Sequence, residues 1–414
     1  MGLVVQKFGG TSVGSVDRIQ NVAEKVARTH AEGHQVVVTV SAMGKTTDEL
    51  VSLARQISSH PPQREMDVLL TTGEQVTIAL LSMALQEKGL KARPMTGWQA
   101  GIQTDPIHGK ARIDHIDTRR VKECLEWGEI VVVAGFQGVS AEGEITTLGR
   151  GGSDTTAVAL AAALRADRCE IFTDVTGVFT ADPRMAPKAS KLKEISYEEM
   201  LELANLGAGV LHPRSVECAM THQVPLVVRS SFVDEEGTCV KEADQMEEQI
   251  NVRGVAHDLQ VARMKVLGLP NRAETLTTLF TRLANAHINV DMIVTSEHDD
   301  ERIDVAFSVH EDEGDEAQSV IEEYQGELGC IKVLSETGLA KVSAVGAGMV
   351  TNPGVAARMF TSLSEAGVRI KMVSTSEIKI SCVIPKGQAE KAVRELHTTF
   401  GLDVEEEALA GVVS

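Results

Sequence analysis

The second half of the chain contains an internal repeat, and this repeat limits the possible folds more than any other feature of the sequence. Residues 279–284 (LFTRLA) match residues 359–364 (MFTSLS) at an offset of 80, and Met292 keeps the same offset to Met372. Each copy reads as a strand, an amphipathic helix and two further strands, followed by a second helix. This order is typical of the ferredoxin-like βαββαβ plan, so the repeat predicts two small α/β modules in tandem.

The predicted modules cover residues 259–335 and residues 336–414. A strand-like segment at 250–257 precedes the first module, and it is a candidate to complete the sheet of the second module. A duplicated module of this size typically binds a ligand or forms a dimer interface, and a purely structural spacer is the alternative.

The first part of the chain, residues 1–233, alternates short β-branched runs with helical patterns. Most of the runs are almost continuously apolar, which is typical of strands covered on both faces. The pattern predicts an α/β domain with a mainly parallel central sheet, and the polar, acid-rich residues 234–258 are predicted to be a linker. The expected strands are 3–8, 35–41, 130–136, 170–173 and 225–230, and the expected helices are 17–30, 72–86, 154–166 and 197–206.

The composition excludes several classes of protein. A formal net charge of −19 and an aromatic content of 3% oppose a nucleic-acid-binding surface. The six cysteines form no CxxC pair, which is typical of reduced thiols in a cytoplasm. No apolar run approaches the ~18 residues of a membrane span, and the start of the chain does not resemble a signal peptide. We therefore expect a cytoplasmic protein with no nucleic-acid or membrane partner and no metal ligands of its own.

A glycine-rich loop, KFGGTSVG at 7–14, follows the first expected strand. Gly9 and Gly10 let backbone N–H groups approach an anion closely, and Lys7 supplies a positive charge for a transferring phosphoryl group. The loop is not a Walker A motif, because no GK[ST] sequence closes it. Taken alone, an ordinary tight turn explains the two glycines equally well.

A second loop of this kind precedes the helix expected at 154–166. Ser153 or Asp154 fits the N-cap position of that helix. A cap does not explain Arg150 beside Gly151 and Gly152, whereas arginine is suited to bidentate binding of a carboxylate. Two such loops in one α/β domain indicate two anionic ligands, a nucleotide and an acidic substrate.

Other segments have both a structural and a functional interpretation. The segment 71–74 (TTGE) fits a capping box, and its spacing alone favours the cap over a ligand-binding Glu74. Ser41 ends an apolar strand, where open α/β sheets bind ligands, and Thr47 follows on the same loop.

The loop 172–184 is either ordinary turn chemistry or the wall of a nucleotide pocket. In the second interpretation Phe179 faces the base, and Asp182 and Arg184 contact ribose or phosphate. His212 has no metal partner at useful spacing, so a structural histidine is favoured.

The chain resembles the aspartokinases in five segments of its first half: KFGGTSVG at 7–14, VSAMG at 40–44, TTGEQ at 71–75, GRGGSDTTA at 149–157 and FTDVTGVFTADPR at 172–184. Its second half resembles their tandem ACT regulatory modules, most closely at 345–360 and 372–381. The resemblance covers essentially the whole chain and is strongest to the lysine-sensitive Gram-positive type with large and small subunits. It implies an amino-acid-kinase three-layer sandwich followed by two ACT modules.

The resemblance implies phosphorylation of the side-chain carboxylate of L-aspartate by MgATP, the first step of lysine, threonine, methionine and diaminopimelate biosynthesis. Lys7 would stabilise charge on the γ-phosphoryl group and Asp154 would orient Lys7. Arg150 would bind the α-carboxylate and Glu74 the ammonium of aspartate, which replaces the capping interpretation. Mg²⁺ would be held mainly by the nucleotide. The other implied substrate-binding residues are Ser41, Thr47, Gly151, Gly152 and Ser153, and the implied ATP-binding residues are Lys7, Phe8, Gly9, Gly10, Thr173, Asp174, Phe179, Asp182 and Arg184.

The resemblance also implies an effector pocket in the second ACT module. The first module departs from the family at 271–275, where a Pro-Gly turn is usual, and at 295–296, where threonine-responsive forms commonly have Gln-Asn. Lysine is therefore expected as the principal inhibitor and threonine as a second candidate. The implied effector-binding residues are Met349, Asn352, Pro353, Gly354, Val355, Ser374, Thr375, Ser376 and Glu377.

Two further implications concern a missing side chain and a partner. Gly209 stands where many relatives have a lysine that reaches ATP phosphate. The sequence from Met246 resembles the start of the small subunit, which implies a free regulatory subunit and a heterotetramer, with a homo-oligomer and an ordinary linker methionine as alternatives.

Two other functions are possible for such a chain, a related kinase of glutamate, acetylglutamate or UMP and a non-catalytic amino-acid sensor. The ACT-like copies oppose the first, and intact Lys7, Arg150 and Asp154 oppose the second.

Overall fold

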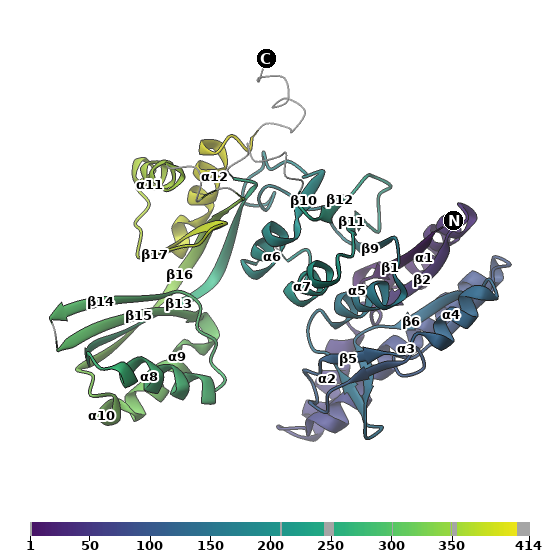
Figure 1. The fold of residues 1–414 in the computed structure, drawn as a ribbon, viewed down its shortest axis with the longest axis horizontal. Helices are drawn as coiled ribbons and strands as arrows, with labels where there is room; N and C mark the ends of the chain where they lie inside the picture. Colours follow the sequence, from purple (N-terminus) through teal and green to yellow (C-terminus); the bar gives the residue numbers. More distant parts are fainter. Residues whose placement is uncertain are drawn as a thin grey trace, which may run out of the picture. The chain divides into compact units, whose positions relative to one another are not determined.

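The structure is a computed structural model that describes residues 2–207, 209–243, 252–299, 301–347, 349 and 354–403. Its described residues form two compact units (Figure 1). The first unit contains residues 2–178, 191–205 and 209–243, and the second contains residues 179–190, 206–207 and 252–403. Each unit is described by itself below.

The first unit is built on an eight-stranded sheet in the order β10-β12-β11-β9-β1-β2-β6-β3. All neighbouring pairs are parallel except β11 and β12. The mainly parallel sheet predicted from the sequence is therefore confirmed, and each of the five expected strands is present. The strands are β1 (Leu3–Phe8), β2 (Gln35–Val40), β3 (Ala92–Met95), β6 (Ile130–Ala134), β9 (Arg168–Thr173), β10 (Glu194–Ser196), β11 (Leu226–Ser230) and β12 (Thr238–Lys241).

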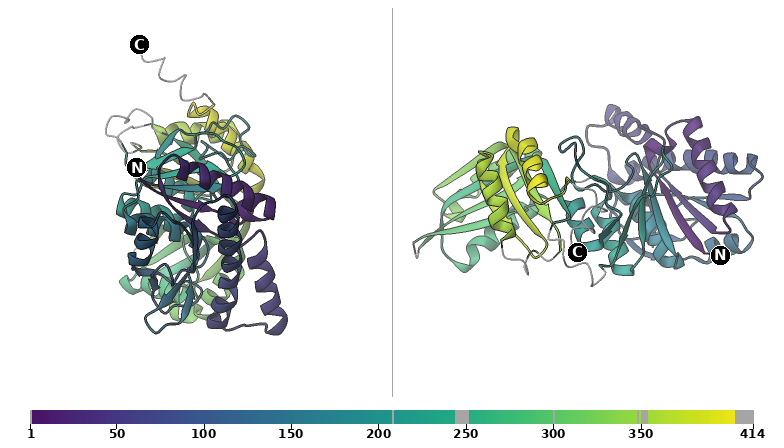
Figure 2. Two further views of the ribbon diagram at one scale, coloured as in Figure 1. Left: turned by 90° about the vertical axis from the view of Figure 1, so that its right-hand side faces the viewer. Right: turned by 90° about the horizontal axis from the view of Figure 1, so that it is seen from above.

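Helices cover both faces of this sheet, which confirms the three-layer arrangement (Figure 2). Phe8 and alternate residues of β2 and β6 pack under α1 (Val16–Ala31) and α3 (Gln63–Glu87). Because side chains alternate along a strand, Lys7 points to the opposite face, where α5 (Gly152–Leu164) packs on β1, β2 and β9. The other helices of this unit are α2 (Thr46–Ile57), α4 (Arg119–Glu126), α6 (Tyr197–Asn205) and α7 (Pro213–His222).

Helix α3 begins at Gln63, earlier than the expected start at residue 72. The segment 71–74 therefore lies inside a helix, and the capping box predicted there is wrong. By length and composition alone α3 would also suffice to cross a membrane. Here it is a core helix, since residues such as Leu81 and Leu85 are fully buried against the sheet.

A small four-stranded sheet in the order β5-β4-β7-β8 extends the first unit. Its strands are β4 (Ile102–Thr104), β5 (Ile113–Ile116), β7 (Gln137–Ser140) and β8 (Ile145–Thr147). The loop from β4 to β5 runs beside the end of β8, where Ala111 N donates to Thr147 O at 2.9 Å. The sheet thus places the 105–112 loop next to the glycine-rich segment that follows Thr147.

The linker predicted at 234–258 is wrong at both of its ends. Thr238–Lys241 forms β12, in which Thr238 and Val240 are fully buried in the sheet of the first unit. The acidic residues around this short strand hide its alternating pattern in the sequence. At the other end, Gly254 already begins a strand of the second unit.

The second unit contains one six-stranded antiparallel sheet in the order β14-β15-β13-β16-β18-β17. Two long strands form its centre, and residues 254–258 of one pair with residues 341–345 of the other. The first long strand therefore supplies an edge to the second βαββαβ module, and the two predicted modules are present but interlocked. The elements are β13 (Gly254–Pro270), α8 (Ala273–Asn285), β14 (Ile293–Asp299), β15 (Arg302–His310), α9 (Gly314–Glu323), α10 (Gln325–Leu328), β16 (Lys332–Val345), α11 (Val355–Glu365), β17 (Met372–Thr375), β18 (Lys379–Pro385) and α12 (Ala389–Thr399).

Residues 179–190 belong to the second unit, although the sequence placed them in the first domain. Ala181 and Ala186 are buried in the core of the second module, together with residues such as Leu396. Thr180 accepts a backbone hydrogen bond from Val255 on β13 (2.7 Å), and its hydroxyl contacts His397 on α12 (2.8 Å). A segment predicted to bind nucleotide is thus built into the second module.

Candidate active site

A cavity of about 1020 Å³ opens in the first unit where β1 and β2 end. Open α/β sheets bind ligands at this edge, because the loops after parallel strands meet there. The cavity brings together all of the catalytic and substrate-binding residues predicted from the sequence, and Gly10 from the predicted ATP-binding set. They are Lys7, Gly10, Ser41, Thr47, Glu74, Arg150, Gly151, Gly152, Ser153 and Asp154.

Lys7 and Asp154 form an ion pair across the cavity wall. The distance from Lys7 Nζ to Asp154 Oδ1 is 2.6 Å, and both side chains are largely buried. Lys7 comes from β1 and Asp154 from the first turn of α5. The pair orients the ammonium group, and a partly buried cation of this kind stabilises developing negative charge more strongly than one in water.

Helix α5 starts differently from the prediction. Its N-cap is Gly151, with a φ of +68°, so Ser153 and Asp154 lie inside the first turn and neither caps the helix. A Cβ atom at Gly151 would lie 2.1 Å from the ring of His212. The glycine is therefore required twice, for its left-handed backbone and for the close approach of His212.

His212 itself has a structural role, as the sequence indicated. It is the N-cap of α7, and its Nδ1 accepts a hydrogen bond from Arg214 N. Burial lowers the pKa of its imidazole.

The first glycine-rich loop closes tightly on the loop after β2. Gly44 N donates to Gly10 O at 3.0 Å, and a Cβ atom at Gly10 would lie 2.9 Å from Ala42 O. A short 3₁₀ turn, η1 (Gly10–Val13), lies between Gly9 and the start of α1. The Phe8 side chain is fully buried and stacked on Phe172, which leaves only its backbone for a ligand.

Glu74 is a buried acid in the wall of the cavity, with 3% of its surface exposed. Its Oε1 accepts a hydrogen bond from Ala42 N at 3.1 Å, while Oε2 has no hydrogen-bond partner among the described residues. Burial raises the pKa of this carboxyl to about 7. Gly73 permits the arrangement, because a Cβ atom there would lie 2.7 Å from Ala42 Cβ. Glu74 is therefore suited to a cationic ligand group that would keep it ionised.

The cavity also contains charged residues that the sequence analysis missed. Lys110, Arg112, Arg214 and Asp67 all line it. Arg214 donates to Leu148 O at 2.6 Å and to Ala111 O at 3.0 Å. One signal was available, since Asp67 precedes Glu74 by seven residues and so shares its face of a helix. Lys110, Arg112 and Arg214 have no comparable spacing to a predicted site residue.

The predicted nucleotide-binding residues are divided between the two units. Thr173 and Asp174 follow β9, and the Thr173 hydroxyl donates to Asp174 at 3.1 Å. Asp182 and Arg184 pair with each other in the second unit, and Arg184 lowers the pKa of Asp182. Gly209 has a φ of +66°, a conformation that a lysine at this position would adopt only with strain.

The predicted effector residues lie at the start of α11 and the end of β17. Met349 and Val355 are buried, Gly354 is the N-cap of α11, and Ser374 is half-buried. The neighbouring residues 375–377 are exposed. Asn352 and Pro353 lie outside the described residues.

Comparisons with known proteins agree with one another. Residues 2–230 match the amino acid kinase family and residues 342–400 match the ACT domain. The chain is 60% identical over 402 residues to the aspartokinase of Bacillus sp. (strain MGA3) and 59% identical over 402 residues to aspartokinase 2 of Bacillus subtilis (strain 168). Both alignments cover 97% of this chain and 98% of the relative.

Solved structures show the same similarity. E. coli aspartokinase III in complex with aspartate and ADP (R-state) matches with a TM-score of 0.81. The same enzyme in complex with lysine and aspartate (T-state) matches with a TM-score of 0.78. Each is 28% identical, and each match covers 96% of this chain and 99% of the other.

The buried carboxyl of Glu74 predicts a pH dependence of stability. Its folded pKa of about 7 lies above the ordinary value of 4.5, so the folded state binds this proton more tightly and stability falls as the pH rises through this window. Glu74→Gln cannot ionise. We expect it to gain on the order of 3 kcal/mol relative to the wild type between pH 4.5 and pH 7.5, measured by urea unfolding. The control is Glu65→Gln, an exposed position on the same helix. Parallel stability curves for wild type and Glu74→Gln would contradict the assignment.

Proposed function

This chain belongs to the aspartokinases and is an aspartate kinase with an ACT regulatory region, and from that premise we propose which of its residues perform the transfer. The sequence resemblance to this family is thereby confirmed. The observation that carries the proposal is the Lys7–Asp154 ion pair, which lies in the same cavity as Glu74 and Arg150. The cavity thus contains a cation for the phosphoryl charge (Lys7), a carboxyl group for the ammonium of an amino acid (Glu74) and a guanidinium for its α-carboxylate (Arg150).

Lys7 stabilises the charge that develops on the γ-phosphoryl group when the side-chain carboxylate of aspartate attacks it in line. Phosphoryl transfer needs little covalent help from the protein, so positioning and electrostatics supply most of the rate. Asp154 holds the ammonium of Lys7 in place from the first turn of α5. The backbone of Gly9 and Gly10 lies beside Lys7, where it can donate to the phosphates.

Arg150 and Glu74 bind the two groups that every α-amino acid carries. The Arg150 side chain is exposed to the cavity, and its planar guanidinium matches a carboxylate. Glu74 pairs with the substrate ammonium, which supplies the partner that its free Oε2 lacks among the described residues. Ser41, Thr47 and Ser153 complete the wall around the substrate.

The enzyme uses a nucleotide, and we assign Thr173, Asp174, Phe179, Asp182 and Arg184 to its base, ribose and phosphates. No group of three or more His, Cys, Asp or Glu side chains within the described residues is arranged to hold a metal ion, and Asp154 is already engaged by Lys7. We expect Mg²⁺ to be held mainly by the phosphates of ATP, whose charge it would neutralise when bound.

The product, 4-phospho-L-aspartate, is a reactive acyl phosphate that a following reaction must consume. We place the enzyme at the start of lysine, threonine, methionine and diaminopimelate synthesis, in the cytoplasm. The conditions of that compartment suit its six free cysteines.

Replacing Lys7 tests the proposed mechanism. We expect Lys7→Ala to lower kcat by roughly 10²–10³ while aspartate binding changes little, because Lys7 acts mainly on transition-state charge. Steady-state phosphorylation of aspartate measures the first effect, and calorimetric titration with aspartate measures the second. The exposed Lys91→Ala is the matched control. A Lys7→Ala enzyme with near-normal kcat would remove Lys7 from the mechanism.

We propose lysine as the principal effector, bound by the second ACT module, with threonine as a second candidate. E. coli aspartokinase III has been solved in complex with lysine and aspartate. In this chain the exposed Glu377 adds an acidic group at the end of β17, which favours an amino acid with an additional positive charge.

Titration of the full chain with lysine, threonine and diaminopimelate tests the effector. Lysine should bind and lower activity through a coupling of about 1–3 kcal/mol, and Glu377→Gln should weaken lysine binding while the exposed Glu365→Gln does not. Binding of threonine without binding of lysine would overturn the proposal.

We also propose that translation from Met246 yields a free regulatory subunit, which assembles with the full chain as a heterotetramer. Met246 lies outside the described residues, and both ACT modules with all of β13 follow it. A start at Met264 would instead lose the part of β13 that pairs with β16 in the second module.

Expression from the native gene followed by intact-mass analysis tests the internal start. A companion chain beginning at residue 246 should be present, and Met246→Leu should eliminate it while Met264→Leu does not. Absence of that chain before mutation would show that the full chain assembles alone.

A further inference from the structure

We infer that Asp67 is a positioning residue, which sets the distance between the two groups that bind the ends of the amino-acid substrate. The inference rests on the proposed roles of Arg150 and Glu74. Asp67 is not itself assigned a contact with substrate.

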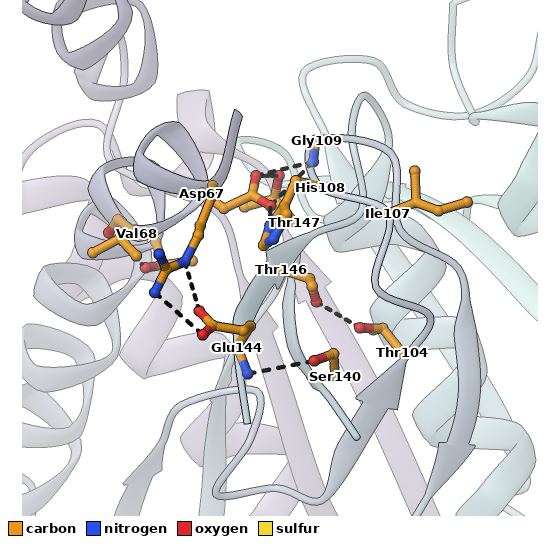
Figure 3. A network of polar contacts seen from close by, with 12 residues as sticks. Asp67, Val68, Thr104, Ile107, His108, Gly109, Ser140, Glu144, Thr146 and Thr147 are labelled. Atoms are coloured by element: carbon orange, nitrogen blue, oxygen red, sulfur yellow. Dashed lines mark hydrogen bonds and ion pairs between the residues drawn. The ribbon is translucent and has the colours of Figure 1, made fainter. Parts of the chain in front are cut away.

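Asp67 is an almost fully buried carboxylate on α3, with 1% of its surface exposed. Figure 3 shows donors converging on it from two other segments. His108 Nδ1 lies 2.8 Å from Oδ2, Gly109 N donates at 3.0 Å, and the Thr147 hydroxyl donates to Oδ1. A buried carboxylate is costly unless it is well hydrogen-bonded, so this cluster holds its three segments together strongly.

The segments that Asp67 joins lead directly to Arg150. Thr147 ends β8, and Arg150 follows three residues later on the glycine-rich loop. Gly149 on this loop has a φ of +76°, and a Cβ atom there would lie 3.0 Å from Gly109 O. The loop therefore packs on the same residue, Gly109, that Asp67 binds.

A second anchor holds the other side of this loop. Arg214 donates to the backbone oxygens of Leu148 and Ala111. Leu148 directly follows Thr147, and Ala111 lies two residues after Gly109. Asp67 binds both Thr147 and Gly109. Between them, Asp67 and Arg214 fix the path of the chain into Arg150.

The position of Asp67 on α3 connects this cluster to Glu74, the group proposed to bind the substrate ammonium. Glu74 lies seven residues further along the same helix and lines the same cavity. The group for the substrate ammonium is thus built into α3, and the loop for the α-carboxylate is fastened to α3 through Asp67. Misplacement of a substrate-binding group by about 1 Å can cost two orders of magnitude in rate.

Two adjacent threonines of β8 provide a matched pair of variants. Both are almost fully buried, and both make a side-chain hydrogen bond. Thr147 donates to Asp67, whereas the Thr146 hydroxyl contacts that of Thr104 at 2.6 Å on the other face of the hairpin (Figure 3). Replacing either with valine removes one buried hydrogen bond at nearly constant shape.

We expect Thr147→Val to raise the KM for aspartate by roughly tenfold or more, with the KM for ATP within twofold of the wild type. Thr146→Val should lower the unfolding midpoint by a similar amount but leave both KM values unchanged. Thr147→Ser, which keeps the hydroxyl, should restore the aspartate KM. Asp67→Asn, which keeps the shape but loses the charge, should raise the aspartate KM in the same selective way.

The experiment separates the possible failures. Equal aspartate KM values for Thr147→Val and Thr146→Val, or equal increases in both KM values for Thr147→Val, would reduce Asp67 to a structural role and overturn the inference. If Thr147→Val does not fold, the comparison of Asp67→Asn with Thr146→Val decides in the same way. Failure of the proposed roles on which the inference rests would appear elsewhere, as an aspartate KM that Arg150→Ala leaves unchanged.

Discussion

The ion pair between Lys7 and Asp154 is the interaction on which the rest of the first unit depends. It requires β1 to end where α5 begins, with the side chain of Lys7 on the face that α5 covers. The same alternation turns Phe8 into the core under α1 and α3. The cation that we assign to phosphoryl charge is thus held one residue away from a fully buried phenyl ring, and the rigidity of the central sheet passes directly to it.

In the second unit, one six-stranded sheet serves both βαββαβ modules. β13 and β16 each contribute to both βαββαβ modules, so neither module has a complete sheet of its own. Residues 179–190 pack into the core of the second module and carry Phe179, Asp182 and Arg184. Because packed cores deform little, a change in the second module has a direct physical route to residues assigned to the nucleotide.

The sequence patterns around the site predicted several of the charged residues and glycines that line it, but they misplaced the starts of the helices that carry them. The sequence identified Lys7, Arg150 and the flanking glycines because few other residues supply those charges and backbone freedoms. The cap interpretations of Glu74 and Ser153 were wrong, because both residues lie inside helices. A capping box consists of helix-compatible residues, so only the position of the true first turn distinguishes the two cases.

The sequence by itself determined the fold class, the two repeated modules and the family of reactions, because hydrophobic period and motif order are properties of the linear chain. Tertiary structure alone decided how the modules interlock, that residues 238–241 join the first sheet, and that Asp67, Arg112 and Arg214 enter the cavity. The physical reason is sequence separation. Asp67 meets His108 and Thr147 across 41 and 80 residues, and no local pattern encodes contacts that depend on the packing of a helix, a loop and a strand edge.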